Sequence, residues 1–324
     1  MPTSSPSPLM TGAIAAAAVP AALYLLNGLA GPKPSTPRAA LAPASERVCI
    51  LGASSGLGRD LAKKYAARGA KVCLVARRAE LIAALARERR REEEEEEEEE
   101  DRRCIGIAAD VAVAEDMVAV RERIRQAWGG LDTLHICAGV SALQPVMDLA
   151  GVAPGEDASA DSIRRVVEIT GRATQGNLVG PLVAALTFRT SSYPAILLVS
   201  SLAAMVGAPT RALYGSTKAS SLLLFQSLAV EHPRIAFTFL LPATIEGNFR
   251  ASAVDAGPVR EADPNKTGLK IDYVANRCIA AVDQQTTGNI FIPFFPNFLA
   301  PLIYTLWPGF VEKAARKKYN FEAS

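Results

Sequence analysis

The stretch RVCILGASSGLGRDLAKKYAARGA, residues 47–70, decides the fold of this 324-residue chain. A short apolar run, RVCIL, leads into three glycines, Gly52, Gly56 and Gly58, and a helical pattern follows directly. Glycines permit a tight turn and a close approach of the backbone, and a helix N-terminus beyond them offers N–H donors and a favourable dipole to a phosphate. The stretch therefore predicts a strand–turn–helix unit that binds the pyrophosphate of a dinucleotide. The alternative is a glycine-rich turn that serves only packing.

Apolar runs that alternate with helical patterns continue along the chain. They cover residues 71–76, 104–109, 133–138, 195–200, 235–240 and 289–293, and a helix is expected from about Ala79. Near-continuous apolar strands separated by helices are typical of a parallel sheet that is covered on both faces. We therefore expect an α/β fold, a doubly wound parallel sheet of the Rossmann type, in a single domain over residues 47–293.

The N-terminal region has a different character. Residues 9–30 form an apolar stretch about 33 Å long as a helix, which is enough to span a bilayer. A cleaved signal peptide is the main alternative, with Ala40-Leu41-Ala42 as its cleavage site. The first basic residues follow the stretch, so the positive-inside rule places the rest of the chain in the cytosol. We expect a membrane anchor over residues 1–32, a proline-rich linker over 33–46, and location on the endoplasmic reticulum.

Charge and cysteine content narrow the class of protein. Nine glutamates occupy residues 92–100, inside a charged insertion over 88–103, and removing them from the net charge of +2 leaves +11 on the rest. A basic fold suits an anionic ligand or membrane, whereas nucleic acid is not expected because no basic stripe with interleaved aromatic residues occurs. The cysteines at positions 49, 73, 104 and 137 lie in apolar runs, which indicates buried thiols in a reducing compartment. With two histidines in the chain, no metal site is expected.

The segment ALYGSTKASS, residues 212–221, places Tyr214 and Lys218 four residues apart in the first turns of a predicted helix. That spacing alone only puts both side chains on one helix face. Ser201, however, stands at a strand end thirteen residues before Tyr214, and the whole lies behind the glycine-rich turn. In this combination the sequence resembles the short-chain dehydrogenase/reductase family over residues 47–293. The C-terminal segment is similar in style to that of membrane-associated members of the family, which act on steroids, retinoids or other lipids.

The resemblance implies a division of chemical roles. A carbonyl that receives a hydride needs a proton on its oxygen, and a nearby ammonium lowers the pKa of a tyrosine that supplies it. By resemblance Tyr214 is the general acid/base, Lys218 its modulator and a ribose ligand, and Ser201 a donor to the substrate oxygen. Asn177 matches the residue that holds a water in the proton relay; a helix-interior asparagine or a cap is the alternative.

The cofactor is expected to be NADP(H), with NAD(H) as the alternative. Arg77 and Arg78 follow the second strand, where an acidic residue would bind the ribose of NAD, and arginine pairs well with a 2′-phosphate. Two ordinary surface arginines are the other interpretation. Asp110 matches the acid that contacts adenine, with helix capping as its alternative. Besides the glycines, Tyr214 and Lys218, the resemblance assigns cofactor contacts to Ser54, Ser55, Leu57, Val111, Ala138, Gly139, Pro242 and Ile245.

The sequence also departs from the family pattern. Leu51 stands where the family has threonine, Cys137 replaces an asparagine, and Ala243 and Gly247 replace a glycine and a threonine. The segment between Cys137 and Asn177 is long, and the one from Asn177 to Ser201 is about one helical turn short. The alternative function is therefore a dinucleotide-binding sensor or scaffold that is catalytically weak or inactive. A nucleotide-sugar epimerase or dehydratase would need a larger C-terminal domain.

Residues 294–324 form an apolar segment with a basic flank. Four prolines, at positions 293, 296, 301 and 308, argue against a regular spanning helix. Aromatic residues followed by lysines and an arginine suit a membrane interface, a cover over an apolar substrate pocket, or a homodimer contact. These features together favour an enzyme that interconverts a ketone and a secondary alcohol on an apolar, lipid-like substrate.

Overall fold

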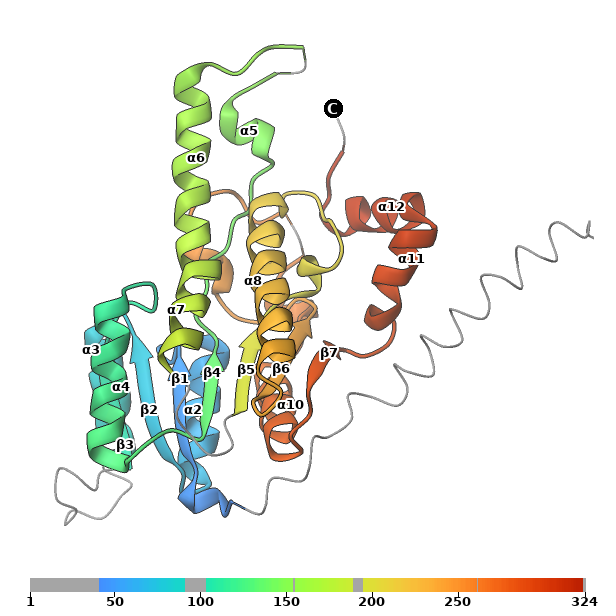
Figure 1. Cartoon of the computed structure of the whole chain (residues 1–324). Helices are drawn as coiled ribbons and strands as arrows, with labels where there is room; N and C mark the ends of the chain where they lie inside the picture. The colour runs from blue at the N-terminus through green and yellow to red at the C-terminus, as the bar shows by residue number, and fades with distance from the viewer. Residues whose placement is uncertain (1–40, 91–102, 154, 189–194, 261, 323–324) are drawn as a thin grey trace, which may run out of the picture.

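A single parallel sheet forms the centre of the protein. The computed structural model describes residues 41–90, 103–153, 155–188, 195–260 and 262–322. Its seven strands run in the order β3-β2-β1-β4-β5-β6-β7, and every neighbouring pair is parallel (Figure 1). The strands are β1 (Arg47–Leu51), β2 (Lys71–Ala76), β3 (Cys104–Ala108), β4 (Thr133–Ile136), β5 (Ala195–Val199), β6 (Ala236–Pro242) and β7 (Gly288–Ile292). The predicted Rossmann-type sheet is confirmed, with each predicted apolar run forming one strand.

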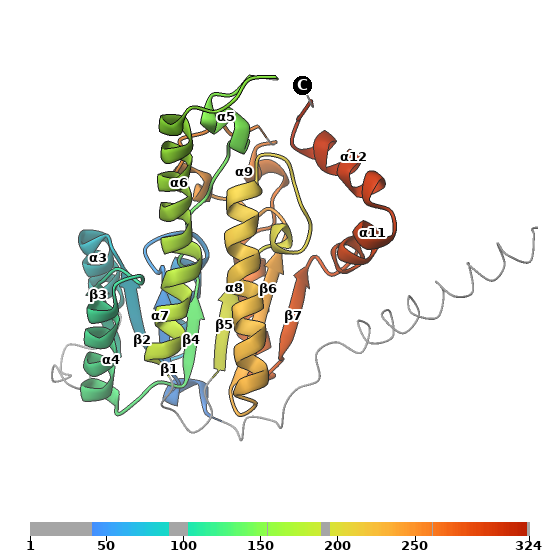
Figure 2. The same ribbon diagram turned by 45° about the horizontal axis from the view of Figure 1, so that its top comes forward.

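Helices cover both faces of the sheet (Figures 1 and 2). Side chains of α2 (Gly56–Ala67), α3 (Ala79–Arg90) and α10 (Ile271–Asp283) bury one face, and those of α4 (Ala114–Trp128), α7 (Gly180–Thr187) and α8 (Ala212–Glu231) bury the other. Because side chains alternate along a strand, Val48 and Ile50 of β1 join the first apolar layer, whereas Cys49 and Leu51 join the second. This two-sided burial is the reason that the strands read as continuous apolar runs.

The long segment after β4 builds a projection above the sheet. It contains α5 (Val146–Ala150) and α6 (Ala160–Thr174), which continues through a π-helical turn (Gln175–Val179) into α7. Figure 1 shows α6 extending past the ends of the strands with α5 beside it. Leu149, Ile169 and Leu213 form a small apolar cluster that joins this projection to the start of α8. The extra length before Asn177 is therefore used on the side of the sheet where the strands end.

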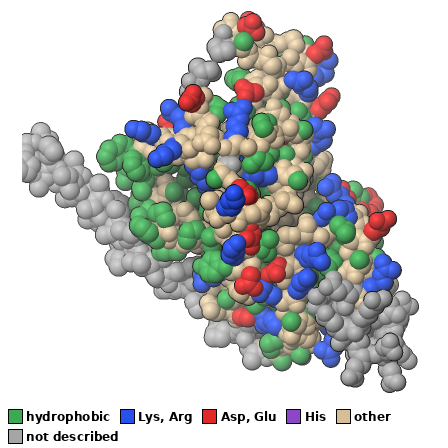
Figure 3. Space-filling view, turned by 180° about the vertical axis from the view of Figure 1, so that it is seen from behind, with side chains coloured by type: hydrophobic (Ala, Val, Ile, Leu, Met, Phe, Trp, Pro, Cys, Tyr) green, Lys and Arg blue, Asp and Glu red, His purple; other side chains and the backbone are tan. Residues whose placement is uncertain are grey.

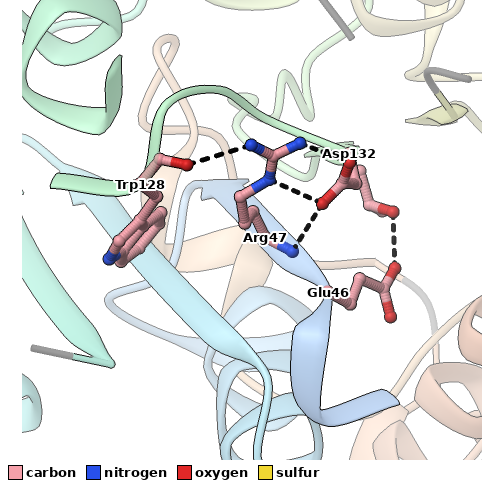
Figure 4. Close-up of polar contacts among 5 residues, drawn as sticks. Glu46, Arg47, Trp128 and Asp132 are labelled. Atoms are coloured by element: carbon pink, nitrogen blue, oxygen red, sulfur yellow. Dashed lines mark hydrogen bonds and ion pairs between the residues drawn. The ribbon is translucent and has the colours of Figure 1, made fainter. Parts of the chain in front are cut away.

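The end of the predicted linker belongs to the folded domain. Pro43–Ser45 forms a short 3₁₀ turn, and buried Glu46 accepts a hydrogen bond of 2.5 Å from Thr133. Arg47 donates to both carboxylate oxygens of Asp132, each at 2.8 Å, and to the carbonyl of Trp128 at 3.0 Å (Figure 4). These contacts fix the chain as it enters β1.

The cysteines are free thiols, and four of the five are buried. Cys137 is the exception to the sequence-based prediction, since it lies one residue beyond β4 and is only partly buried. Within the described residues no helix is both long enough and apolar enough to cross a bilayer. The predicted anchor over residues 9–30 and the glutamate run lie outside the described residues.

The C-terminal segment consists of short helices at one end of the sheet. A 3₁₀ turn (Asn297–Leu299) leads into α11 (Ala300–Leu306), and α12 (Pro308–Lys318) follows after Trp307. Pro301 lies in the first turn of α11 and Pro308 begins α12, which are positions where proline is tolerated. The prediction that these prolines prevent one continuous helix is confirmed.

Candidate active site

The glycine-rich turn lies at the C-terminal end of β1, where the chain leaves the sheet between β2 and β4. Ligands of open parallel sheets bind at such a position, outside the ends of the strands where the direction of winding reverses. A Cβ on Gly52 would lie 2.7 Å from the backbone nitrogen of Ala138, and one on Gly58 would collide with the carbonyl of Gly52. Gly56, with a φ of +54°, shares a left-handed conformation with Gly52, whose φ is +91°, but a Cβ on Gly56 would meet nothing within 4 Å. Two glycines therefore serve close packing, and the third turns the chain beside open space.

Helix α2 begins at Gly56, directly after this turn. Its N-cap residue, Ser55, is extended, and the Ser55 side chain does not accept a hydrogen bond from the first N–H groups of the helix. Backbone donors at the start of a twelve-residue helix, next to a glycine-rich turn, fit the pyrophosphate of a dinucleotide.

The two arginines after β2 have different environments. The guanidinium of Arg78 donates to Ser54 Oγ at 2.7 Å and to Ser55 Oγ at 2.9 Å, so it holds the glycine-rich turn. Arg77 is 71% exposed, and its nearest acidic group is Asp110, at 4.0 Å. Both side chains are exposed, but Arg78 is held by the turn, whereas Arg77 is not hydrogen-bonded to it.

Asp110 and Val111 follow β3 on the same side of the sheet. Asp110 Oδ1 accepts from the backbone N–H of Ala112 at 2.9 Å, and the N-cap of α4 is Val113. The alternative role of Asp110 as a helix cap is therefore wrong, since its carboxylate closes a local turn three residues before the N-cap Val113. The side chain of Val111 packs against the start of α7, where a Cβ on Gly180 would lie 2.7 Å from it.

Asn177 joins the loop after β4 to helix α8. It is fully buried in the π-helical turn, where its Oδ1 accepts from Val140 N at 2.9 Å and its Nδ2 donates to Val140 O at 3.0 Å and to Thr217 Oγ1 at 3.0 Å. A Cβ on Gly139 would lie 2.9 Å from Asn177 Oδ1 and 3.2 Å from Lys218 Nζ. The side chains of Asn177 and Lys218 thus converge on the backbone of Gly139.

Lys218 is a buried cation at this point. Its Nζ donates to the carbonyl of Val199, at the end of β5, over 2.9 Å. Burial lowers the pKa of Lys218 to about 8, and Cys137 nearby acts in the opposite direction. Burial also raises the pKa of Cys137 to about 12, so its thiol is neutral when the ammonium of Lys218 is charged. At neutral pH Lys218 keeps its positive charge within a nearly dry site.

Helix α8, which carries Tyr214, packs on the 3₁₀ turn Leu202–Ala204, which follows Ser201. Ser201 caps that turn, its Oγ accepting from Ala203 N at 3.2 Å. Gly215 permits the contact, because a Cβ there would lie 2.9 Å from the carbonyl of Ala203. The partly buried ring of Tyr214 meets Phe249 edge-on, with 6.0 Å between the ring centroids.

The remaining predicted contacts lie at the same edge of the sheet. Leu57 is buried in α2, Ala138 follows β4, and Pro242 ends β6. Ile245 pairs with Leu269 in an isolated bridge beyond β6. Sequence reasoning missed Arg211 and Asp255, two buried charged residues beside the site; a charged residue three positions before Tyr214 is the signal that could have found the first.

A parallel sheet with this turn and this edge defines a Rossmann-type fold that binds a nicotinamide dinucleotide. The sequence profile of the short chain dehydrogenase family matches residues 46–256, and the chain belongs to this family. Dehydrogenase/reductase SDR family member 7B of Mus musculus is 27% identical, over 86% of this chain and 83% of its own length. The 11-beta-hydroxysteroid dehydrogenase A of Sesamum indicum is 31% identical, over 63% of this chain and 53% of its own.

Solved structures share the fold. An alcohol dehydrogenase from the archaeon Thermococcus sibiricus, complexed with 5-hydroxy-NADP, superposes with a TM-score of 0.59 at 21% identity and covers 76% of this chain and 95% of its own. A 3-ketoacyl-(acyl-carrier-protein) reductase from Brucella melitensis, complexed with NADH, gives a TM-score of 0.59 at 20% identity, over 76% and 96%.

Proposed function

We propose that the protein is an NADP(H)-dependent oxidoreductase that interconverts a ketone and a secondary alcohol on an apolar, lipid-like substrate. The observation that carries the proposal is the buried ammonium of Lys218, one helical turn from the hydroxyl-bearing side chain of Tyr214, at the sheet edge beside Gly139. A charged group in a water-poor site favours the phenolate form of a neighbouring tyrosine far more than the same charge would in water.

The chain offers a binding surface for the dinucleotide along the sheet edge. The backbone at Gly56 and the first N–H groups of α2 would hold the pyrophosphate, and Asp110 would lie toward the adenine. Lys218 Nζ and the backbone of Gly139 would meet the nicotinamide half. When bound, the nicotinamide supplies or accepts the hydride.

Side chains of the protein would supply the proton and hold the substrate oxygen in place. Tyr214 would donate its hydroxyl proton to the carbonyl oxygen in reduction and recover it in oxidation, and Ser201 would hold that oxygen by a hydrogen bond. Lys218 stabilises the phenolate that forms. Asn177 would position a water between Lys218 and solvent, and its bonds to both backbone groups of Val140 fix its amide for that role.

The preference for NADP(H) over NAD(H) rests on Arg77. Its side chain is exposed and carries no hydrogen bond to the turn, in contrast to that of Arg78. The end of β2 has no acidic residue that would repel a 2′-phosphate. An arginine free to reach a phosphate binds it through two parallel donors.

An apolar substrate fits the surroundings of Tyr214 and the surface beyond. Phe249 packs against the tyrosine ring, and the relatives include proteins named for hydroxysteroids. Large apolar side chains are exposed on the C-terminal segment, and Figure 3 shows apolar side chains gathered on this part of the molecule with basic ones beside them. The exposed residues are Phe294, Phe295, Leu306, Trp307 and Phe310.

Such a surface supports attachment to a membrane through the C-terminal segment, in addition to the anchor expected over residues 9–30. We infer location on the cytosolic face of the endoplasmic reticulum. Carbonate extraction of membranes tests the anchor, because it removes surface-bound protein and leaves a spanning protein in the pellet. Release of the full-length chain would contradict a spanning helix, and protection of the domain from protease in intact microsomes would contradict the cytosolic orientation.

Turnover by the purified full-length protein tests the chemistry. Oxidation of NADPH in the presence of a panel of apolar ketones, steroid and long-chain among them, is expected to exceed that with short polar ketones. Binding of NADPH without turnover of any ketone or secondary alcohol would instead favour the alternative, a dinucleotide sensor of the same fold.

A further inference from the structure

The C-terminal end of the chain returns to the edge of the candidate active site. Tyr319, the residue after α12, is buried, and its ring lies 5.6 Å from the guanidinium carbon of Arg211. The same guanidinium carbon is 6.0 Å from the ring centroid of Tyr214. Both distances are within the range in which a guanidinium is attracted to an aromatic face. Arg211 therefore bridges the end of α12 and the tyrosine proposed to carry the proton.

Arg211 also holds the loop that follows β4. Its Nη1 donates to Ser141 Oγ at 3.2 Å and to the carbonyl of Ala142 at 3.0 Å. Arginine suits this task because its planar group presents several donors in fixed directions while its charge persists at any physiological pH. One buried side chain thus connects three separate parts of the chain.

A second buried charge holds the next two residues of the loop. Asp255 Oδ2 accepts from Leu143 N at 2.6 Å and from Gln144 N at 2.8 Å. Residues 141–144 are therefore fixed from two sides, by Arg211 at the start of α8 and by Asp255 beyond η5 (Phe249–Ser252). This loop begins one residue after Val140, which Asn177 binds, and its Ala142 belongs to the apolar cluster against which Tyr214 packs.

The C-terminal end has an additional connection on this side. Asn320 Nδ2 donates to the carbonyl of Arg260 at 2.9 Å, and the side chain of Arg260 reaches Asp148 of α5 at 3.4 Å. Figure 2 shows the chain passing from α12 toward α5. Through Arg260, the residues after α12 are therefore connected to α5, which follows loop 141–144 in the chain.

We propose that Arg211 is a positioning residue, and that Tyr319 holds it so that the C-terminal segment sets the place of loop 141–144 beside Tyr214. The C-terminal segment then governs the affinity for the substrate and leaves the affinity for the dinucleotide unchanged. The part that concerns substrate rests on the proposed function. The coupling between Tyr319 and the loop does not depend on it.

Hydrogen exchange of the full-length protein in detergent tests the coupling without any substrate. Tyr319→Leu is expected to speed exchange of the Leu143 and Gln144 amides, which donate to Asp255, about tenfold. Tyr319→Phe, which keeps the ring face, is expected to restore slow exchange. Tyr273→Leu makes the same change at an exposed site on α10 and is the control. Unchanged exchange in Tyr319→Leu, or an equal increase throughout the protein, would overturn the proposal.

Kinetics test the functional half. Tyr319→Leu and Arg211→Lys are expected to raise KM for a ketone about tenfold, with kcat within about twofold and the Kd for NADPH unchanged. A fall in kcat without a change in KM would overturn the positioning role. If the wild-type protein turns over no ketone or alcohol, the proposed function fails, and the exchange measurement still decides whether Tyr319 controls the loop.

Discussion

Replacement of Arg77 by alanine is expected to weaken NADPH and to spare NADH. The side chain is 71% exposed and lies 4.0 Å from Asp110, so it has no strong partner to give up when a 2′-phosphate arrives. A hydrogen bond to a charged group contributes about 1.5–3 kcal/mol, and exposure to solvent favours the lower figure. About 1.5 kcal/mol corresponds to a tenfold increase in the Kd for NADPH.

Arg78→Ala is the matched control. Arg78 holds Ser54 and Ser55 of the glycine-rich turn, so its loss is expected to weaken NADPH and NADH to a similar degree. Isothermal titration calorimetry of each variant with NADPH and with NADH, at low and at high salt, compares the Kd values. The selective loss in Arg77→Ala is expected to shrink as salt screens the exposed charge. An equal loss for NADPH and NADH in Arg77→Ala would refute the assignment of this residue to the 2′-phosphate.

Three further outcomes follow from the site and the core. Gly58→Ala is expected to lower both the melting temperature and the cofactor affinity, because the added Cβ would collide with the backbone of Gly52. Gly56→Ala is expected to cost only about 1–2 kcal/mol of backbone strain, because its Cβ would meet no neighbour. A lower Tm for Gly56→Ala than for Gly58→Ala would contradict the close contact between Gly58 and Gly52. Cofactor affinity should weaken as pH rises through about 8, where Lys218 loses its proton, and a flat profile to pH 10 would count against that charge. Burial lowers the pKa of His135 to about 3, so between pH 6.5 and pH 3 this side chain binds a proton only in the unfolded protein. The free energy of unfolding should therefore fall by up to about 1.4 kcal/mol for each pH unit below 6.5. Urea unfolding should find a smaller pH dependence in His135→Asn.

The sheet and the order of its helices could be predicted because its inner strands are buried on both faces. Such a strand is a run of apolar residues, as in RVCIL and KVCLVA, which shows where the strand lies to within one or two residues at each end. The glycine-rich turn was equally readable, because Gly52 and Gly58 are required by backbone contacts that no other residue permits.

Contacts between distant segments could not be predicted from spacing. Nothing in the sequence separates Arg77 from Arg78, and only the fold turns the second toward Ser54 and leaves the first exposed. Arg211 and Tyr319 are more than a hundred residues apart, and their contact depends on how α12 ends.

One departure from the family pattern has a physical reason. Gly247 stands where the family has threonine, and here its φ of +102° is a conformation that a threonine would adopt only with strain. Its backbone N–H is bound by Asn265 Oδ1 at 2.9 Å. The backbone after β6 therefore favours glycine at this position, and the sequence alone could show the substitution without its cause.

The central claim is that Tyr214 supplies the proton for reduction of a carbonyl. Comparison of wild-type protein with Tyr214→Phe tests it most directly, by the single-turnover rate of NADPH oxidation on a confirmed ketone together with the Kd for NADPH. The account predicts a rate lower by at least about a hundredfold, in keeping with the loss of a general acid, and a Kd within about twofold of wild type. A variant that retains a near wild-type rate would contradict the assigned chemistry.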